Sequence, residues 1–117
     1  MAYRPVSSKS GGALPWFLQR VTGIVLLFVM VGHYILMHYN IDSGHTYDAV
    51  LSRMQNPFYK GLQMTFVVLG IYHGINGTWS VVRDFKLKKS VSWTIYSLLV
   101  ISGVVFGLIG ITTLITL

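Results

Sequence analysis

One histidine lies in the middle of a long apolar stretch and is the residue best placed to do chemistry. It is His73, within the segment GIYHGING at residues 70–77. An ionisable side chain at membrane depth is energetically costly, so such residues usually have a function. On a helix, Gly70, Gly74 and Gly77 lie near the face of His73, where a flat, bulky ligand could rest on bare backbone. The pattern favours an axial ligand to a membrane-embedded haem. The alternative is a histidine that hydrogen-bonds a neighbouring helix.

The other three histidines are weaker candidates. His33 follows Gly32 deep in the first apolar stretch, and its role stays open between axial ligation of a second haem and packing. His38 lies near the end of that stretch, where a solvated histidine costs little energy, and His45 falls in a polar loop. We expect both to be surface residues.

The composition is that of a membrane protein. The 117 residues form one unit and are 53% hydrophobic but only 10% charged. The net charge of +6 comes from basic residues that flank apolar stretches, which argues against a nucleic-acid partner. The chain has no cysteine, so it can hold no iron–sulfur cluster or thiolate metal site of its own. No apolar stretch carries a central Asp or Glu, which argues against a transporter.

Three apolar stretches each exceed 18 residues, enough to cross about 30 Å of hydrocarbon. We therefore predict an all-α membrane protein with three transmembrane helices. The predicted segments are a tail at 1–14, helices at 15–38, 61–82 and 93–117, and loops at 39–60 and 83–92. The first loop should contain a short helix around residues 46–54. Gly103, Gly107 and Gly110 predict close packing of the third long helix against a neighbour.

The basic residues predict the orientation. The tail carries Arg4 and Lys9, and the second loop region carries four basic residues: Arg83, Lys86, Lys88 and Lys89. The longer first loop has only Arg53 and Lys60, alongside two aspartates. The positive-inside rule then makes the N-terminus and second loop cytoplasmic, in a multi-pass protein of the cell's inner (cytoplasmic) membrane. The basic second loop either docks soluble subunits or serves only topology and lipid contact.

Depth separates the two intramembrane histidines. His73 lies ten residues before Arg83, about 15 Å from the cytoplasmic end of its helix. His33 lies seventeen residues after Trp16, about 25 Å from the same side. Two axial ligands of one iron must lie at nearly the same level, so these two cannot share a haem. A partner subunit must supply the second ligand of each haem, one at His73 and, if His33 is a ligand, another there.

Two charged residues at the cytoplasmic ends could serve a cofactor. Arg20, which we expect to be buried at the start of the first helix, could bind a haem propionate or a polar quinone head. Its alternative is an arginine that extends to lipid headgroups. Asp84 lies eleven residues beyond His73 and about 20° from it in helical phase, about 16 Å towards the cytoplasm. We predict Arg20 and Asp84 as candidate quinone contacts.

Several motifs together resemble the small three-helix membrane anchors of succinate:quinone oxidoreductase, the succinate dehydrogenase and fumarate reductase family. They are Trp16-x-x-Gln19-Arg20-Val21-Thr22-Gly23, Gly32-His33, His73-Gly74-x-x-Gly77 and Arg83-Asp84. The resemblance covers residues from about 15 to 89. Each motif alone is weak, and their order and spacing make the set fairly specific. The chain is most similar to the D-type anchor, which pairs with a second, C-type three-helix anchor.

The resemblance implies a function without catalysis by this chain itself. His73 would bind haem b opposite a histidine of the C-type anchor, and Gly32-His33 would match the ligand region of two-haem members. The two anchors would hold a flavoprotein and an iron–sulfur subunit on the cytoplasmic face, so FAD and iron–sulfur clusters belong only to those partners. Electrons would pass from succinate to quinone in the lipid membrane. Arg20 would lie near haem propionates and quinone, and Asp84 would match the acidic residue beside the quinone.

One position departs from the family pattern. Position 85 is Phe85, where relatives that reduce ubiquinone carry a tyrosine whose hydroxyl binds the quinone. Phenylalanine cannot donate that hydrogen bond, so the quinone type and its contacts stay open. Two other functions also stay open: a structural anchor without haem, and a cytochrome b subunit of a different quinone-linked dehydrogenase or of fumarate reductase.

Overall fold

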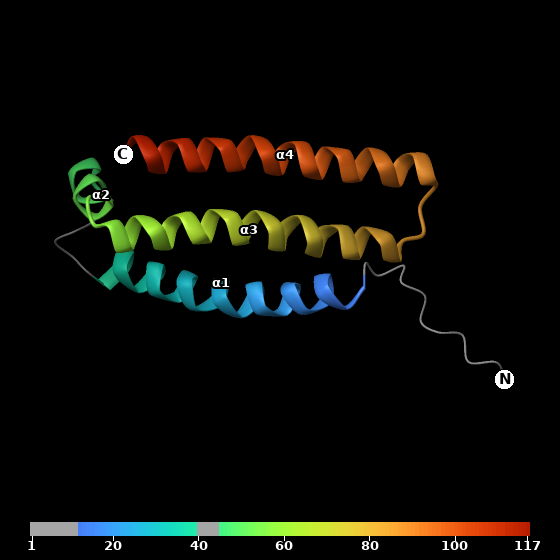
Figure 1. Ribbon diagram of the computed structural model, residues 1–117, viewed down its shortest axis with the longest axis horizontal. Helices are drawn as coiled ribbons and strands as arrows, with labels where there is room; N and C mark the ends of the chain where they lie inside the picture. Colours follow the sequence, from blue (N-terminus) through green and yellow to red (C-terminus); the bar gives the residue numbers. More distant parts are fainter. Residues whose placement is uncertain (1–11, 40–44) are drawn as a thin grey trace.

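A computed structural model describes residues 12–39 and 45–117, which fold into helices joined by short connections (Figure 1). The helices are α1 (Ala13–Tyr39), α2 (Tyr47–Met54), α3 (Pro57–Asp84) and α4 (Lys89–Thr116). The short helix α2 lies where the sequence predicts one in the first loop. The predicted tail, at 1–14, and the predicted loop at 39–60 lie partly outside the described residues.

The three long helices lie side by side in one layer, with α3 between α1 and α4 (Figure 1). A single layer has little interior, and the residues described as buried in it are Thr22, Gly107 and Leu114, with Met54 buried in α2. Large apolar side chains point outward instead, and Phe28 and Phe106 are 72% and 68% exposed. So much exposed apolar surface is typical of a chain that contacts lipid and other membrane subunits.

The middle helix differs from its neighbours in polarity. Helices α1 and α4 are long and apolar enough to cross a membrane. Helix α3 is as long, with 28 residues, but carries the polar side chains of Gln63, His73 and Asn76. Each of these three contacts α1 through a side chain or backbone group, so the polar groups of α3 meet protein. The lower hydropathy of α3 therefore follows from its central position.

Local chemistry explains where α3 begins and ends. The side chain of Asn56 accepts hydrogen bonds from the backbone of Phe58 and Tyr59, at 2.9 and 3.3 Å, and Pro57 occupies the first turn. The helix thus starts four residues before the predicted span. It ends before Lys86, whose φ of 50° lies in the left-handed region and turns the chain towards α4.

Glycines on α4 bring it close to α3, as the sequence predicts. A Cβ added to Gly107 would lie 2.8 Å from Cδ1 of Ile71, and one added to Gly110 would lie 3.1 Å from Val67. Gly103 similarly faces Ile71 and Ile75. Larger residues at these positions would force the two helices apart.

Candidate functional site

The imidazole of His73 lies between α3 and α1. Its Nδ1 is 3.0 Å from Oγ1 of Thr22, which is only 4% exposed. A Cβ added to Gly23 would lie 3.1 Å from Cε1 of the same ring. The ring therefore rests directly against the backbone of α1, in a space that exists because residue 23 has no side chain.

The hydroxyl of Thr22 determines which nitrogen of His73 carries the proton. A threonine hydroxyl has one proton, and that of Thr22 points to the carbonyl of Leu18 at 2.6 Å. The hydroxyl is then an acceptor towards His73, so Nδ1–H donates to it. In a neutral imidazole the lone pair is left on Nε2, which has no hydrogen-bond partner among the described residues.

This arrangement joins the two roles that the sequence leaves open for His73. One nitrogen makes a hydrogen bond to a neighbouring helix, and the other retains the lone pair that an iron ion needs. Metal-ligating histidines usually donate their other N–H in this way. The residues present therefore fit axial ligation of a haem at His73.

A network of amide groups links α1 to α3 about one helical turn from the Thr22–His73 contact, towards the start of α1. Nε2 of Gln19 donates to the carbonyl of His73 at 3.2 Å, and Asn76 donates to Oε1 of Gln19 at 2.8 Å and to the carbonyl of Pro15 at 3.4 Å. A Cβ added to Gly77 would lie 2.6 Å from Nε2 of Gln19. Gly77 thus admits the Gln19 side chain.

The other two glycines of the predicted face lie differently. A Cβ on Gly74 would meet no atom within 4 Å, and one on Gly70 would reach only Leu26, at 4.0 Å. Of the three, Gly74 therefore offers open backbone beside His73. Gly77 lies at the contact between the two helices.

Sequence reasoning missed four residues of this region: Gln19, Thr22, Gly23 and Asn76. Three of them belong to the motif at the start of the first helix, where only Arg20 received a role. A signal was available, because a threonine followed by a glycine can offer a hydroxyl and free space to one side chain. The sequence alone does not show which face of α1 meets His73, because that depends on how the two helices pack.

His33 lies in a different setting further along α1. Its Nδ1 is 3.5 Å from Nε2 of Gln63, and both residues line a cavity of about 30 Å³ with Val29 and Phe66. This cavity has room for little more than a water molecule. A Cβ on the adjacent Gly32 would meet nothing within 4 Å.

The two histidines contact partners at different levels of the layer. His73 meets α1 at Thr22, eleven residues from His33, which corresponds to about 16 Å along the helix. The distance exceeds the expected mismatch of about 10 Å and likewise prevents the two from sharing one iron. His38 and His45 are both exposed, with ring centroids 5.7 Å apart.

The predicted quinone residues lie apart from His73. Arg20 is exposed, contrary to the expectation of burial, because its guanidinium folds back over the ring of Trp16 at 3.6 Å and donates to the Trp16 carbonyl. Asp84 is exposed at the last residue of α3. Within the described residues, neither forms a hydrogen bond or ion pair with His73 or with the other. Phe85 is also exposed, at 70%.

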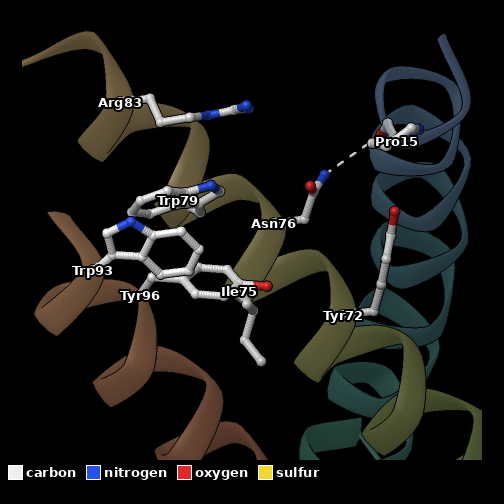
Figure 2. A pocket seen from close by; sticks show the side chains of 8 residues that line it. All are labelled: Pro15, Tyr72, Ile75, Asn76, Trp79, Arg83, Trp93 and Tyr96. Atoms are coloured by element: carbon white, nitrogen blue, oxygen red, sulfur yellow. Dashed lines mark hydrogen bonds between the residues drawn. The ribbon is translucent and has the colours of Figure 1, made fainter. Parts of the chain in front are cut away.

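A cavity of about 470 Å³ lies over α3 near its C-terminal end (Figure 2). Its lining residues are Pro15, Tyr72, Ile75, Asn76, Trp79, Arg83, Trp93 and Tyr96. The rings of Trp79, Trp93 and Tyr96 gather on one side, and Tyr72 and Pro15 lie on the other (Figure 2). Half of the lining residues are aromatic and one carries a guanidinium, and the cavity is large enough for a small molecule or part of a lipid.

A layer of long helices with outward apolar side chains, two of them long and apolar enough to cross a membrane, is typical of a helical membrane protein. The comparisons give its family. The chain belongs to the succinate dehydrogenase/fumarate reductase transmembrane subunit family, whose profile matches residues 3–113. The resemblance to this family inferred from the motifs is thereby confirmed, and the chain is a transmembrane anchor subunit.

Individual relatives agree with this assignment. The chain is 33% identical over 108 residues to the succinate dehydrogenase hydrophobic membrane anchor subunit of Thermoplasma acidophilum, covering 84% of this chain and 86% of that relative. It is 24% identical over 71 residues to the same subunit of Archaeoglobus fulgidus, covering 61% of each. With that of Rickettsia typhi it shares 26% identity over 89 residues, or 73% of this chain and 70% of the relative.

Proposed function

We propose that this chain is the D-type anchor subunit of succinate dehydrogenase and that it binds haem b through Nε2 of His73. The observation that carries the proposal is the contact between His73 and Thr22, which leaves Nε2 free in an anchor of this family. Haem b, when bound, supplies a one-electron acceptor and donor within the membrane. The chain would hold it by the imidazole, with the open backbone at Gly74 beside the ring.

The proposed topology has three transmembrane helices, α1, α3 and α4, with the N-terminus and the α3–α4 connection in the cytoplasm. Length supports α3 as a span, since 28 residues rise about 42 Å, more than the hydrocarbon thickness. Its polar side chains support it too, because they contact α1 and need not face lipid. The basic residues Arg83, Lys86, Lys88 and Lys89 support the orientation in an inner (cytoplasmic) membrane.

The partners follow from this role. A C-type anchor would supply the opposite axial histidine, since His33 lies too far along α1 to do so. The anchors would hold the iron–sulfur and flavoprotein subunits on the cytoplasmic side, and electrons would pass from succinate to quinone. Arg20 and Asp84 remain the proposed quinone contacts, and both are exposed and accessible to a partner or ligand.

For His33 the proposal keeps two roles, ligation of a second haem and packing. Within this chain the small cavity and the contact with Gln63 favour packing. A haem at this level would require the ring to turn away from Gln63. The haem count of the complex decides between the two roles.

The test is to purify the intact membrane complex through a tag on this chain and to measure haem b per covalently bound flavin. The reduced-minus-oxidised spectrum is recorded on the same sample. One haem per flavin supports His73 alone, and two support His33 as well. A complex without haem b would contradict the proposal and leave the chain as a structural anchor.

A further inference from the structure

We propose that Thr22 is a positioning residue for the haem ligand: its hydroxyl accepts a hydrogen bond from Nδ1–H of His73, which leaves Nε2 as the more basic nitrogen that would bind the haem iron. This inference rests on the proposed haem site at His73. It goes beyond that site because it assigns a tuning function to a residue of α1 that would act on the iron only through His73.

The first support is that the acceptor role of Thr22 is enforced by its own helix. The Thr22 hydroxyl lies 2.6 Å from the carbonyl of Leu18 and 3.2 Å from that of Gln19, and its one proton is directed to these carbonyls. Only its lone pairs remain for the imidazole. Because the residue is 4% exposed, solvent does not compete for this contact.

The second support is that the ring is confined as well as hydrogen-bonded. The absence of a side chain at Gly23 leaves the space in which Cε1 lies, 3.1 Å from where a Cβ would be. On the α3 side, Gln19 donates to the carbonyl of His73 and so ties the backbone of the ligand residue to the same helix. Thr22, Gly23 and Gln19, which lie within about one turn of α1, thus fix the position of the His73 ring.

The electronic consequence has a definite sign. A hydrogen bond from Nδ1–H to an acceptor raises the basicity of a ligating imidazole. A more basic ligand stabilises ferric over ferrous iron and lowers the reduction potential. Removal of the acceptor should therefore raise the potential of haem b.

The experiment uses the intact complex carrying Thr22→Val, which keeps the shape and removes the hydroxyl. Within α1, the Thr22 hydroxyl donates only to carbonyls that already accept backbone bonds, so valine leaves α1 intact. Redox titration followed by haem absorbance is expected to show a tenfold shift towards ferrous haem, which is about 59 mV for one electron. If the valine complex does not assemble, Thr22→Ala gives the same reading.

Two further variants separate the hydroxyl from packing. Thr22→Ser restores the hydroxyl and is expected to keep the wild-type potential. Thr113→Val removes an equivalent hydroxyl on α4, bonded to Ile109 at 2.7 Å, and is expected to change nothing. An unchanged potential in Thr22→Val, or an equal shift in Thr22→Ser, would overturn the inference.

The haem assignment itself is checked separately in the same series. His73→Ala is expected to lose the haem. If His73→Ala retained the wild-type spectrum, the proposed function would fail and this inference with it. If His73→Ala lost the haem but Thr22→Val kept the wild-type potential, only the role of Thr22 would be rejected.

Discussion

His73 and His33 both lie between α1 and α3, yet their surroundings differ in kind. His73 meets a hydroxyl whose proton is already committed to its own helix. His33 meets the amide of Gln63, at 3.5 Å, the limit of a hydrogen bond. An amide can present either its NH₂ or its carbonyl by rotation, so it does not determine which imidazole nitrogen is protonated.

The neighbouring glycines repeat this contrast. Gly23 lies against the His73 ring, whereas Gly32 has nothing near its would-be Cβ. A glycine next to a histidine in sequence, as in Gly32-His33, is therefore weaker evidence for space beside the ring than a glycine that packing places against the ring. The comparison suggests a criterion for a candidate ligand histidine, namely which group holds its second nitrogen.

The largest expected difference between the two regions is in haem content. His73→Ala should remove the haem b signal, because it deletes the axial nitrogen. His33→Ala should keep that signal if His33 only packs. Haem per covalently bound flavin in the two purified complexes measures this difference. Equal losses in the two variants would make the regions alike and support a second haem at His33.

The next effect concerns the space beside each histidine. Gly23→Val should displace the His73 ring, because the added atoms would occupy its position, and lower haem affinity by about 10–100-fold. Gly32→Val is the matched control and should retain the haem. The measurement is the haem remaining per flavin after extended detergent washing. Similar retention in both variants would show that Gly23 does not shape the site.

A smaller effect is expected from the amide network next to His73. Replacing Gln19 and Asn76 by alanine, singly and together, should give a coupling energy of about 0.6 kcal/mol and at most about 1.7 kcal/mol. Denaturing-detergent titration of the purified complex, followed by haem absorbance, measures the three losses. Strictly additive losses would indicate that the hydrogen bond contributes nothing to the packing of α1 on α3.

The smallest effect is expected at Gln63. Its contact with His33 is long, so Gln63→Leu should change the stability of the complex by less than about 0.6 kcal/mol and leave the haem spectrum intact. The same titration and spectrum measure both quantities. Loss of haem from this variant would contradict the packing role of His33.

Much of the fold was accessible from the sequence. The lengths of the apolar stretches predicted the three long helices, and the glycines of α4 predicted its close contact with α3. The helix starts were less predictable, because α3, capped by Asn56, and α4, which begins at Lys89, both start before their apolar parts. The polar side chains of α3 lower its hydropathy. Their contacts with α1 explain why a long, otherwise apolar helix carries them.

The candidate site was only partly predictable. His73 stood out because an imidazole in an apolar helix is unusual, but its partner Thr22 lies 51 residues away in sequence. The rotation of α1 about its axis decides which side chains meet His73, and the sequence of one helix does not contain that angle. The exposure of Arg20 depends on the same angle, whereas its contact with Trp16 is between residues four apart on α1 and is local to that helix.

The most direct test of the central claim is to replace His73 by methionine in the intact complex and record its spectrum and reduction potential. Methionine can still ligate iron but produces histidine–methionine ligation, which raises the potential. We predict a retained haem with an altered spectrum and a higher potential. An unchanged bis-histidine spectrum with an unchanged potential would show that His73 is not the axial ligand.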